Sequence, residues 1–373
     1  MKVALVVPGG VDRSGRERVI PALLWLIERL ARRHQLLVVA LRQEPMPTRY
    51  PLLGAQVVNL GQPGTRLPGL RLWTQLRRLI AALTAGDRPV DLIHGFWLGE
   101  AGLLAGLAGR WLRLPVIVSV GGGELVSLPD AGYGGWGDWR GRLRASLALR
   151  MARAATAGSH YARAPLDATG RTLHWLPLGV DTRLFDAPIQ RAGGPPWRLL
   201  HVSSINRVKD PGTLLHAVRL VADRQPDLQL DWVGIDTLSG AAQRLAASLG
   251  LAGLVHFHGF RPIDQIAPLY RRAHLYLQSS LHESQGVAVC EAAAAGLPTV
   301  GTAVGLVAEW APDAALAVPV ADPRALAGGI LELLADSTRR ASIGRRAQAW
   351  ARAHDADWTA AQFEALYENT YTG

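Results

Sequence analysis

The sequence predicts an α/β protein with two domains, each built on a doubly wound parallel sheet, and a helical tail. Three observations predict this class. The chain has 373 residues, more than one hydrophobic core usually supports. Short runs rich in Val, Leu and Ile alternate with longer helical patterns, which is typical of parallel sheets with crossover helices. The alternation starts again after a segment rich in Pro and Gly at residues 187–197.

The apolar runs give the expected strands. In the first half they span residues 2–7, 36–41, 56–60, 91–95, 116–120, 156–158 and 172–176. In the second half they span residues 198–202, 229–234, 255–259, 275–278, 299–302 and 316–318. Helical patterns at 325–335, 342–353 and 358–371 form the tail. This order predicts two Rossmann-like halves facing a cleft, with ligand-binding residues in the loops directly after the strands.

The predicted domain boundary lies in the Pro- and Gly-rich segment, whose composition is typical of a linker. We expect an N-terminal domain at residues 1–189 and a C-terminal domain at residues 190–355. The last helix, at 356–373, is expected to pack back toward the N-terminal domain.

The composition indicates a globular protein, with 49% hydrophobic and 19% charged residues. The longest apolar stretch, 103–120, contains Arg110, Arg113 and Pro115, so it lacks the roughly 20 apolar residues of a membrane-spanning helix. The first apolar run is shorter than the core of a signal peptide. Cys290 is the only cysteine, which excludes an intrachain disulfide and favours a reducing compartment. We therefore expect a cytoplasmic location.

The positive charge is concentrated in the first half of the chain. Residues 1–189 carry 24 Arg and Lys against 13 Asp and Glu, whereas the remaining residues carry 16 against 17. Such a field favours anionic partners, including acidic lipids and phosphorylated acceptors. Nucleic acid is not expected as a partner, because the sequence has no zinc-finger, RRM or homeodomain signature.

Residues 279–305 carry the most informative motif. A strand ends near Gln278, a polar loop follows, and a helix begins at about Val287 with Glu291 in its second turn. Gly286 allows the backbone to approach a ligand, and the helix N-terminus offers N–H groups to a phosphate. Glu283 and Glu291 can accept hydrogen bonds from sugar hydroxyls.

This stretch resembles the E-x7-E signature of the retaining family-4, or group 1, glycosyltransferases, which have the GT-B fold. The resemblance implies that Glu283 faces the transferred sugar and that Glu291 binds the nucleotide ribose. It also implies a donor-binding role for Ser284, Gln285, Gly286 and Val287.

Residues 202–218 resemble the loop whose basic residues grip the donor diphosphate in this family. Lys209 stands at that position and is one of only two Lys among 40 basic residues, which favours a specific role. The family's usual Gly-Arg falls on Ser203 and Ser204, so the second cation is missing and Arg207 is the candidate replacement. The resemblance implies catalytic roles for Glu283, Lys209 and Arg207, and places Ser204 in the donor site.

The N-terminal half supplies candidates for the acceptor side of the cleft. Residues 8–21 resemble the family's glycine-rich loop and contain Gly9, Gly10, Gly15 and Arg16. Arg13, Arg16 and Arg18 would add positive charge near the leaving phosphates. A plain tight turn is the alternative interpretation of this loop.

Residues 116–126 resemble the family segment V-H-G-x-E, with Gly121 in place of the histidine that commonly contacts the transferred sugar. Glu124 is then the polar candidate there, and a helix cap is the alternative role. His94, at the end of the expected strand 91–95, is another candidate, although such a histidine can also be structural.

The resemblance implies transfer of a hexosyl group from a nucleotide diphosphate sugar to a glycan or lipid-linked acceptor, with retention of configuration. It implies a front-face displacement without a metal ion or other cofactor. The triplet at residues 355–357 resembles a metal-binding D-x-D motif, but its place at a helix start favours a cap. Two alternatives remain open: a nucleotide-sugar epimerase on the same fold, and a non-catalytic nucleotide-sugar-binding protein.

Residues 66–83 form a basic amphipathic pattern beside Trp73. Its apolar face consists of Leu72, Leu76, Leu79, Ile80 and Leu83. Such a helix suits an anionic membrane surface, and an ordinary helix packed on the sheet is the alternative. We expect peripheral attachment to the inner face of the cytoplasmic membrane.

Overall fold

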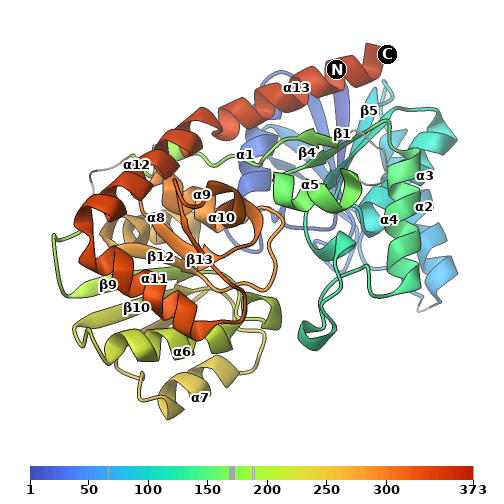
Figure 1. The fold of residues 1–373 in the computed structure, drawn as a ribbon. Coiled ribbons are helices and arrows are strands. Elements are labelled where there is room, and N and C mark those ends of the chain that lie inside the picture. The colour runs from blue at the N-terminus through green and yellow to red at the C-terminus, as the bar shows by residue number, and fades with distance from the viewer. Residues whose placement is uncertain (66, 168–172, 187, 189, 373) are drawn as a thin grey trace. The chain divides into compact units, whose positions relative to one another are not determined.

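The computed structural model describes residues 1–65, 67–167, 173–186, 188 and 190–372. It divides into two compact units, which Figure 1 shows. Unit 1 comprises Met1–Leu178 and Ala356–Gly373, and unit 2 comprises Gly179–Asp355. The division lies ahead of the predicted boundary at residue 189, which is outside the described residues. The reason is packing, because Phe185 is buried against Tyr270 of unit 2, with 5.6 Å between the ring centroids.

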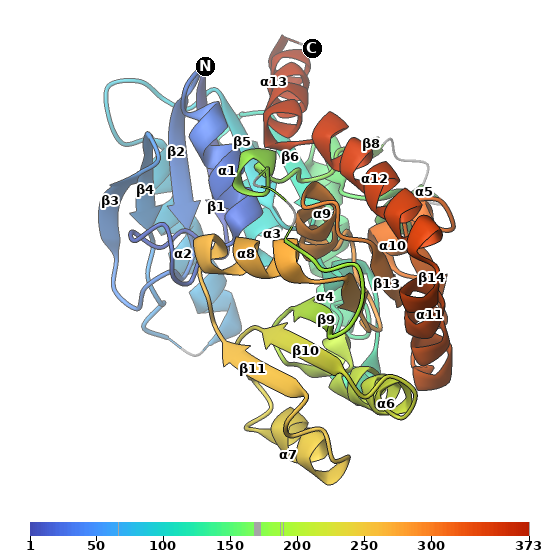
Figure 2. The same ribbon diagram turned by 90° about the vertical axis from the view of Figure 1, so that its left-hand side faces the viewer.

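The sheet of unit 1 has the strand order β3-β4-β2-β1-β5-β6-β7-β8, part of which is seen in Figure 2. Its strands are β1 (Lys2–Val7), β2 (Gln35–Ala40), β3 (Thr48–Leu52), β4 (Ala55–Asn59), β5 (Leu92–Phe96), β6 (Val116–Val120), β7 (Ala154–Ala157) and β8 (Leu173–Trp175). β3 pairs antiparallel with β4, and the other neighbours in this order pair in parallel. The strand order reverses between β1 and β5, so the switch point of unit 1 lies there.

Helices cover both faces of this sheet. They are α1 (Pro21–Leu30), α2 (Pro68–Leu83), α3 (Glu100–Leu112), α4 (Trp139–Met151), α5 (His160–Asp167) and α13 (Ala356–Thr372). α1 and α13 pack on one face, and α2, α3 and α4 pack on the other. Ala4 and Val6 of β1 face the second group, whereas Val3 and Leu5 face the first. This double burial explains why the first strand reads as a continuous apolar run.

α13 is an integral part of unit 1, although it follows unit 2 in the chain. Phe363 and Tyr367 are buried in the core formed with α1. Arg29 of α1 donates to both carboxylate oxygens of Asp357, at 2.8 and 3.1 Å. Apolar packing and a two-point ion pair therefore hold the last helix on unit 1.

The apolar face predicted for α2 lies in the core of unit 1. Leu76, Leu79 and Leu83 are buried against the sheet, and Leu72 and Ile80 pack against the same cluster. The expectation that this face meets a membrane is therefore wrong, because the sheet already covers it. Among the described residues no helix combines the length and the apolarity needed to cross a bilayer.

Unit 2 contains a parallel sheet with the strand order β11-β10-β9-β12-β13-β14. Its strands are β9 (Trp197–Val202), β10 (Leu228–Val233), β11 (Val255–Gly259), β12 (Leu275–Gln278), β13 (Thr299–Thr302) and β14 (Leu316–Val318). The order reverses between β9 and β12, which defines the switch point of this sheet.

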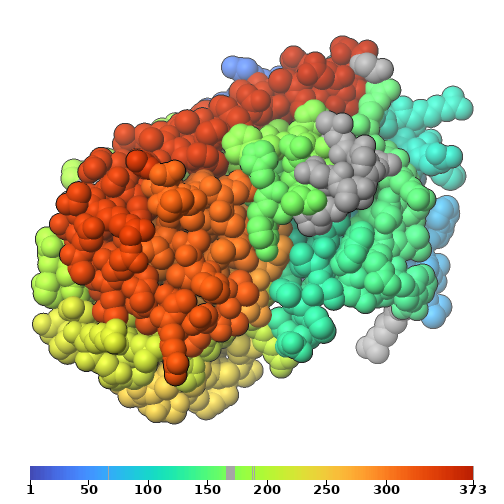
Figure 3. Space-filling view, viewed as in Figure 1, coloured from blue at the N-terminus to red at the C-terminus, as the bar shows by residue number. Residues whose placement is uncertain are grey.

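The helices of unit 2 are α6 (Pro211–Ala222), α7 (Ala241–Ser248), α8 (Ile263–Arg272), α9 (Val287–Ala294), α10 (Gly305–Trp310), α11 (Pro323–Ala335) and α12 (Ser337–Ala353). α6, α7 and α11 share one apolar cluster with the sheet. Tyr270 of α8 lies beside Tyr276 of β12, with 6.0 Å between the ring centroids. Side chains of α11 and α12 form much of the surface of unit 2 in Figure 3.

The strand predictions agree with the structure to within two residues at the described positions, and the prediction of two Rossmann-like units is confirmed. The expected strand at 172–176 begins at a residue outside the described ones, and β8 starts at Leu173. The sequence did not predict β3, which contains Pro51 and pairs only with β4 in the described sheet. An edge strand tolerates proline because one side of its backbone needs no partner.

Candidate functional site

The candidate donor residues of unit 2 follow β9 and β12, the strands on either side of its switch point. After β9 the chain forms the 3-10 helix η4 (Arg207–Lys209), and after β12 a loop leads into α9. Two hydrogen bonds join these loops. The N–H of Leu281 donates to the carbonyl of Val208 at 2.8 Å, and the Ser279 hydroxyl donates to that of Lys209 at 2.7 Å. The parallel pairing therefore brings the two predicted motifs to one edge of the sheet.

Lys209 and Glu283 meet across these loops in an ion pair between Nζ and Oε1. The Ser280 hydroxyl donates to the same Oε1 at 2.7 Å. The Asn206 side chain caps η4 by accepting from the backbone N–H of Lys209 at 3.1 Å. The side chains of Lys209 and Glu283 are 22% and 15% exposed, so both remain reachable by a ligand.

Two opposing effects act on Glu283. Burial raises its pKa, but the charge of Lys209 and the hydrogen bonds from Lys209 and Ser280 lower it, and the net pKa is below the ordinary value. Glu283 is therefore a carboxylate at neutral pH. In that form it only accepts hydrogen bonds, as recognition of ligand hydroxyls requires.

Glu291 occupies a drier position, in the second turn of α9, and is 5% exposed. Tyr270 Oη donates to its Oε2 at 2.7 Å. Burial raises the pKa of Glu291 to about 7, although the Tyr270 hydrogen bond lowers it. After burial, the charges of Glu283 and Glu291 are the main causes that raise the pKa of Tyr276. Both predicted carboxyl groups therefore lie near enough to Tyr276 for their charges to act on its phenol.

The start of α9 lies between these carboxyl groups in the sequence. Gly286 caps the helix with a φ of 91°, a conformation that favours glycine. The N–H of Val289 bonds to the carbonyl of Gly286 at 2.9 Å, so the N–H of Val287 precedes the first helical bond. Gly286 and Val287 are partly exposed, whereas Ser284 and Gln285 are buried. Within the predicted donor loop, the backbone at Gly286 and Val287 is therefore the more accessible part.

Ser204 and Arg207 are exposed at the end of β9. The Arg207 guanidinium makes no hydrogen bond or ion pair with the residues that the structure describes. Sequence reasoning missed His201, whose Nδ1 lies 2.7 Å from the Leu277 carbonyl and whose Nε2 lies 2.6 Å from the Ser203 hydroxyl. Burial lowers the pKa of His201 to about 4, so the ring is neutral. The sequence does contain a signal for His201, because a histidine is unusual inside an apolar run such as residues 197–202.

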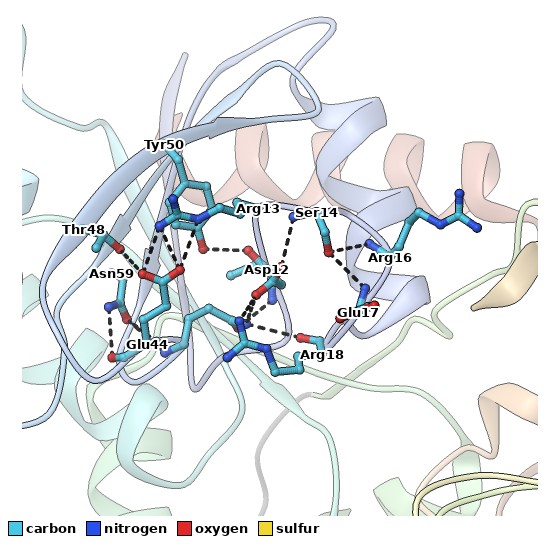
Figure 4. Close-up of polar contacts among 12 residues, drawn as sticks. Asp12, Arg13, Ser14, Arg16, Glu17, Arg18, Glu44, Thr48, Tyr50 and Asn59 are labelled. Carbon is cyan, nitrogen blue, oxygen red and sulfur yellow. Dashed lines mark hydrogen bonds and ion pairs between the residues drawn. The ribbon is translucent and has the colours of Figure 1, made fainter. Parts of the chain in front are cut away.

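In unit 1, charged residues of the loop after β1 pair with each other and with residues after β2, as Figure 4 shows. Arg13 pairs with Glu44, with 2.9 Å between Nη2 and Oε1, and its guanidinium lies over the Tyr50 ring at 5.3 Å. Arg18 pairs with Asp12. The positive charges of Arg13 and Arg18, which we expected near the leaving phosphates, are thus balanced by Glu44, which follows β2, and by Asp12 of the loop itself.

Glycines allow the backbone of this loop to adopt conformations that other residues disfavour. Gly10 has a φ of 82°, and a Cβ there would lie 2.6 Å from Ile20. Gly9 lies in the same loop, and Gly15 closes the turn that begins at Asp12 with a φ of 63°. In Figure 4 the Arg16 side chain points away from the paired residues.

His94 belongs to the core of unit 1 rather than to an accessible site, which corrects the sequence expectation. Its side chain is fully buried, with Nδ1 2.8 Å from Tyr367 Oη and Nε2 2.8 Å from Ser119 Oγ. Burial lowers the pKa of His94 to about 3. A neutral, fully bonded imidazole that links β5 to α13 has a structural role.

Gly121 and Glu124 lie in the loop after β6, where the 3-10 helix η1 (Gly123–Leu125) forms. The Glu124 carboxylate accepts from the backbone N–H of Gly122 at 2.7 Å. Burial raises the pKa of Glu124 above its ordinary value, although backbone hydrogen bonds lower it. Glu124 therefore does act as a local cap, at a position close to the carboxyl edge of the sheet.

Two family models match successive parts of the chain. Residues 19–179 match the glycosyl transferase 4-like domain, and residues 185–350 match the glycosyl transferases group 1. The chain belongs to the group 1 glycosyltransferases. The predicted family resemblance is thereby confirmed, and the two matches follow the division into unit 1 and unit 2.

Curated group 1 glycosyltransferase relatives match part of the chain. The D-inositol 3-phosphate glycosyltransferase of Corynebacterium jeikeium is 31% identical over 221 residues, 54% of this chain and 53% of that protein. The MMP alpha-(1->4)-mannosyltransferase of Mycolicibacterium hassiacum is 34% identical over 182 residues, 47% of this chain and 43% of that protein. The chain thus spans about half the length of the curated relatives that it matches.

Solved structures confirm the GT-B class for this group 1 glycosyltransferase. Sucrose-phosphate synthase from Thermosynechococcus elongatus has a TM-score of 0.81 at 20% identity, covering 100% of this chain and 99% of that one. HepE of Anabaena, in complex with UDP and glucose, has a TM-score of 0.76 at 18% identity, covering 99% and 100%.

The D-x-D-like triplet of this group 1 glycosyltransferase lies at the start of α13. Asp357 pairs there with Arg29. Over the described part of the chain, no three His, Cys, Asp or Glu side chains are grouped as metal ligands. The ion pair gives Asp357 a structural role in unit 1.

Proposed function

We propose that this chain is a retaining glycosyltransferase that moves a hexosyl group from a nucleotide diphosphate sugar to a glycan or lipid-linked acceptor. The observation that carries the proposal is the Lys209–Glu283 ion pair at the switch point of unit 2, next to the start of α9 with Glu291 in its second turn. A cation, helix N–H donors and two carboxyl groups suit a diphosphate with a sugar ring on each side. Membership of the family supports the same assignment.

In the proposed complex, Lys209 and the N–H of Val287 bind the diphosphate. Glu283 accepts from hydroxyls of the transferred sugar, and Glu291 accepts from the ribose hydroxyls. Lys209 pairs with Glu283 in the ligand-free protein. When the diphosphate binds, it shares the Lys209 ammonium group with the Glu283 carboxylate. The exposed Arg207, at the other end of η4, is the proposed second cation in place of the one missing at Ser204.

In the proposed transfer, the bond between the anomeric carbon and the leaving phosphate oxygen breaks, and its electron pair stays on the diphosphate. The acceptor hydroxyl oxygen forms the new bond on the same face of the sugar, and its proton passes to a phosphate oxygen. Lys209 and the start of α9 stabilise the negative charge that develops on the diphosphate. Preorganised groups of this kind commonly contribute several kcal/mol. The scheme needs neither a metal ion nor another cofactor.

A thermal-shift screen tests the donor site. UDP-, GDP-, ADP- and dTDP-sugars are added to the wild-type protein and to the Lys209→Ala and Glu291→Ala variants, because a ligand of the native state raises its apparent stability. We expect one donor class to stabilise the wild type and neither variant. No shift with any donor would overturn the assignment of the site.

A transfer assay then tests the activity. Products formed with the stabilising donor are analysed by NMR, and the anomeric coupling gives the stereochemistry. Transfer with retention supports the proposal. Donor binding without transfer to any acceptor favours a binding protein, and interconversion of the free nucleotide sugar favours an epimerase.

The acceptor screen includes phosphorylated polyols as well as neutral glycans and lipid-linked sugars. The excess of basic residues in 1–189 supports an anionic acceptor. D-Inositol 3-phosphate is one such compound, and it appears in the name of a curated relative. We expect phosphorylated acceptors to have lower KM values than their dephosphorylated counterparts, and equal values would contradict this part of the proposal.

We also propose that the protein is cytoplasmic and that unit 1 contacts the anionic inner face of the membrane. The start of α2 supports this, because Leu67, the residue directly before the helix, and Leu70 and Trp73 are 67%, 51% and 49% exposed. Arg71 and Arg77 lie on the same helix. Co-sedimentation with phosphatidylglycerol vesicles should exceed that with phosphatidylcholine vesicles and should fall in Leu70→Ser/Trp73→Ser. Protein that stays in the supernatant with both vesicles would refute the contact.

A further inference from the structure

The position where the family histidine is missing is occupied by another side chain. An ideal Cβ built on Gly121 would lie 1.4 Å from Cδ1 and 1.5 Å from Nε1 of Trp97. These distances are far below any van der Waals contact, so the indole fills the space in which a side chain at position 121 would begin. Gly121 is therefore required by the placement of Trp97, and its role is to admit that ring.

The backbone holds Trp97 in this place. Its carbonyl accepts from the N–H of Gly102 in α3 at 2.7 Å, and a Cβ on Gly102 would lie 2.7 Å from the same oxygen. Its ring packs edge-on to Phe96, with 6.5 Å between the centroids. Burial raises the pKa of the Glu124 carboxyl group, and the backbone N–H groups of Gly121 and Leu98 are among the groups that lower it. Glu124 therefore lies close to both the loop that carries Trp97 and the loop over which the indole lies.

The location is one at which parallel α/β sheets bind ligands. Trp97 directly follows β5, which borders the switch point between β1 and β5 in unit 1. The side chain is partly exposed, and its indole N–H has no hydrogen-bond partner within the described residues. A second aromatic ring lies nearby, since a Cβ on Gly123 would be 2.5 Å from Tyr133. Gly121 and Gly123 thus admit two aromatic side chains at the carboxyl edge of the sheet.

We propose that Trp97 is a substrate-contacting residue of unit 1 and packs its indole face against a pyranose ring of the acceptor. This inference rests on the proposed glycosyl transfer for its biological setting. An aromatic face suits the C–H face of a sugar ring, and the free N–H suits one of its hydroxyls.

A kinetic experiment separates this role from donor binding. Trp97→Phe and Trp97→Ala are compared with wild type for the KM of acceptor and donor, and Trp111→Ala, at a tryptophan 67% exposed on α3, is the matched control. We expect Trp97→Ala to raise the acceptor KM about tenfold. The donor KM should change less than about twofold, with Trp97→Phe in between. An unchanged acceptor KM, or a change confined to the donor KM, would overturn the inference.

A binding experiment remains decisive if no transfer is found. The protein is labelled with 5-fluorotryptophan, and the Trp97 resonance is assigned as the ¹⁹F signal lost in Trp97→Phe. Methyl α-glucopyranoside and methyl α-mannopyranoside are then added up to about 100 mM. We expect the Trp97 signal to shift while the Trp111 signal stays in place. A shift without any transfer would sink the proposed function alone, whereas an unmoved Trp97 signal with both sugars would overturn the acceptor contact.

Gly121→Ala provides a test that leaves the tryptophan in the sequence. Its Cβ would overlap the indole, so the ring must leave its place. We expect the same increase in acceptor KM as in Trp97→Ala. The double variant Trp97→Ala/Gly121→Ala relieves the overlap and should recover the thermal stability that Gly121→Ala loses. Normal acceptor kinetics in Gly121→Ala with a destabilised fold would argue for a purely structural role of Trp97.

Discussion

Replacing Glu291 with Gln should stabilise the ligand-free protein at alkaline pH and abolish donor binding. The amide keeps the shape of the side chain, and its oxygen can still accept the Tyr270 hydrogen bond. The substitution removes the free-energy cost of ionising a carboxyl group that is only 5% exposed. The same substitution removes the negative charge that we propose to bind the ribose hydroxyls.

The magnitude follows from the pKa of Glu291, which burial raises from 4.5 to about 7. The folded state keeps a proton that the unfolded state releases, so stability falls as pH rises from 4.5 to about 7 and is constant above that. At 1.36 kcal/mol for each pKa unit, the full loss is about 3 kcal/mol. Gln does not titrate, so the variant should exceed the wild type by about 1 kcal/mol at pH 5 and about 3 kcal/mol at pH 8.

Urea denaturation of both proteins from pH 5 to pH 8 measures this difference, with the transition of unit 2 followed by circular dichroism. Glu283→Gln is the control with the opposite sign. The pKa of Glu283 is lowered in the folded state, so its charge contributes stability that is present above the unfolded pKa and lost on acidification. A stability difference between Glu291→Gln and wild type that stays flat or shrinks as pH rises would refute the reasoning.

Three further predictions concern the two units. Lys209→Ala should lower kcat/KM by about 100-fold or more with little change in melting temperature, because its charge acts on the leaving diphosphate. Arg207→Ala should lower kcat/KM less, and equal losses of activity and stability in Lys209→Ala would contradict this role. His94→Ala should destabilise the protein by about 2–4 kcal/mol in urea denaturation, since it leaves a cavity and an unpaired Tyr367 hydroxyl, while calorimetric nucleotide binding is unchanged. Lost binding at full stability would place His94 in a ligand site instead. Arg29→Ala should destabilise unit 1 by about 1–2 kcal/mol and speed proteolysis at α13, because the partly exposed Asp357 loses its partner. Unchanged cleavage would contradict that contribution.

The donor motif was predictable because its parts are local in sequence. The strand β12, Gly286 and the start of α9 lie within one short stretch, so spacing alone places Glu283 and Glu291. The meeting of Lys209 with Glu283 needed only the parallel pairing of β9 and β12. The proposed roles of these residues remain predictions until the variants are measured.

The roles of His94, Arg13 and Arg18 could not be predicted from the sequence, because they depend on contacts between distant segments. His94 is held by Tyr367, 273 positions away, and this pairing decides that the imidazole is structural. Arg18 and Arg13 are balanced by Asp12 and Glu44, and no spacing rule for loops predicts the pairing of Arg13 with a residue 31 positions away.

The gap at Gly121 has the same cause. In the sequence alone, a glycine in place of a functional residue suggests that the site has lost a side chain. The side chain that fills the space belongs to another loop, so the sequence around residue 121 does not reveal it. Only the geometry between the segments after β5 and β6 identifies Trp97 as the occupant.

The placement of α13 has a consequence for the order in which the chain matures. Unit 2 is continuous in sequence, whereas unit 1 is completed by residues that leave the ribosome after all of unit 2. At about 5–20 residues per second, synthesis of the 177 residues Gly179–Asp355 takes roughly 10–35 s. Throughout that interval His94 lacks Tyr367 and Arg29 lacks Asp357. During this time, residues 1–178 lack α13, and the apolar face that α13 covers in the finished protein is exposed. A chaperone would bind this face during translation.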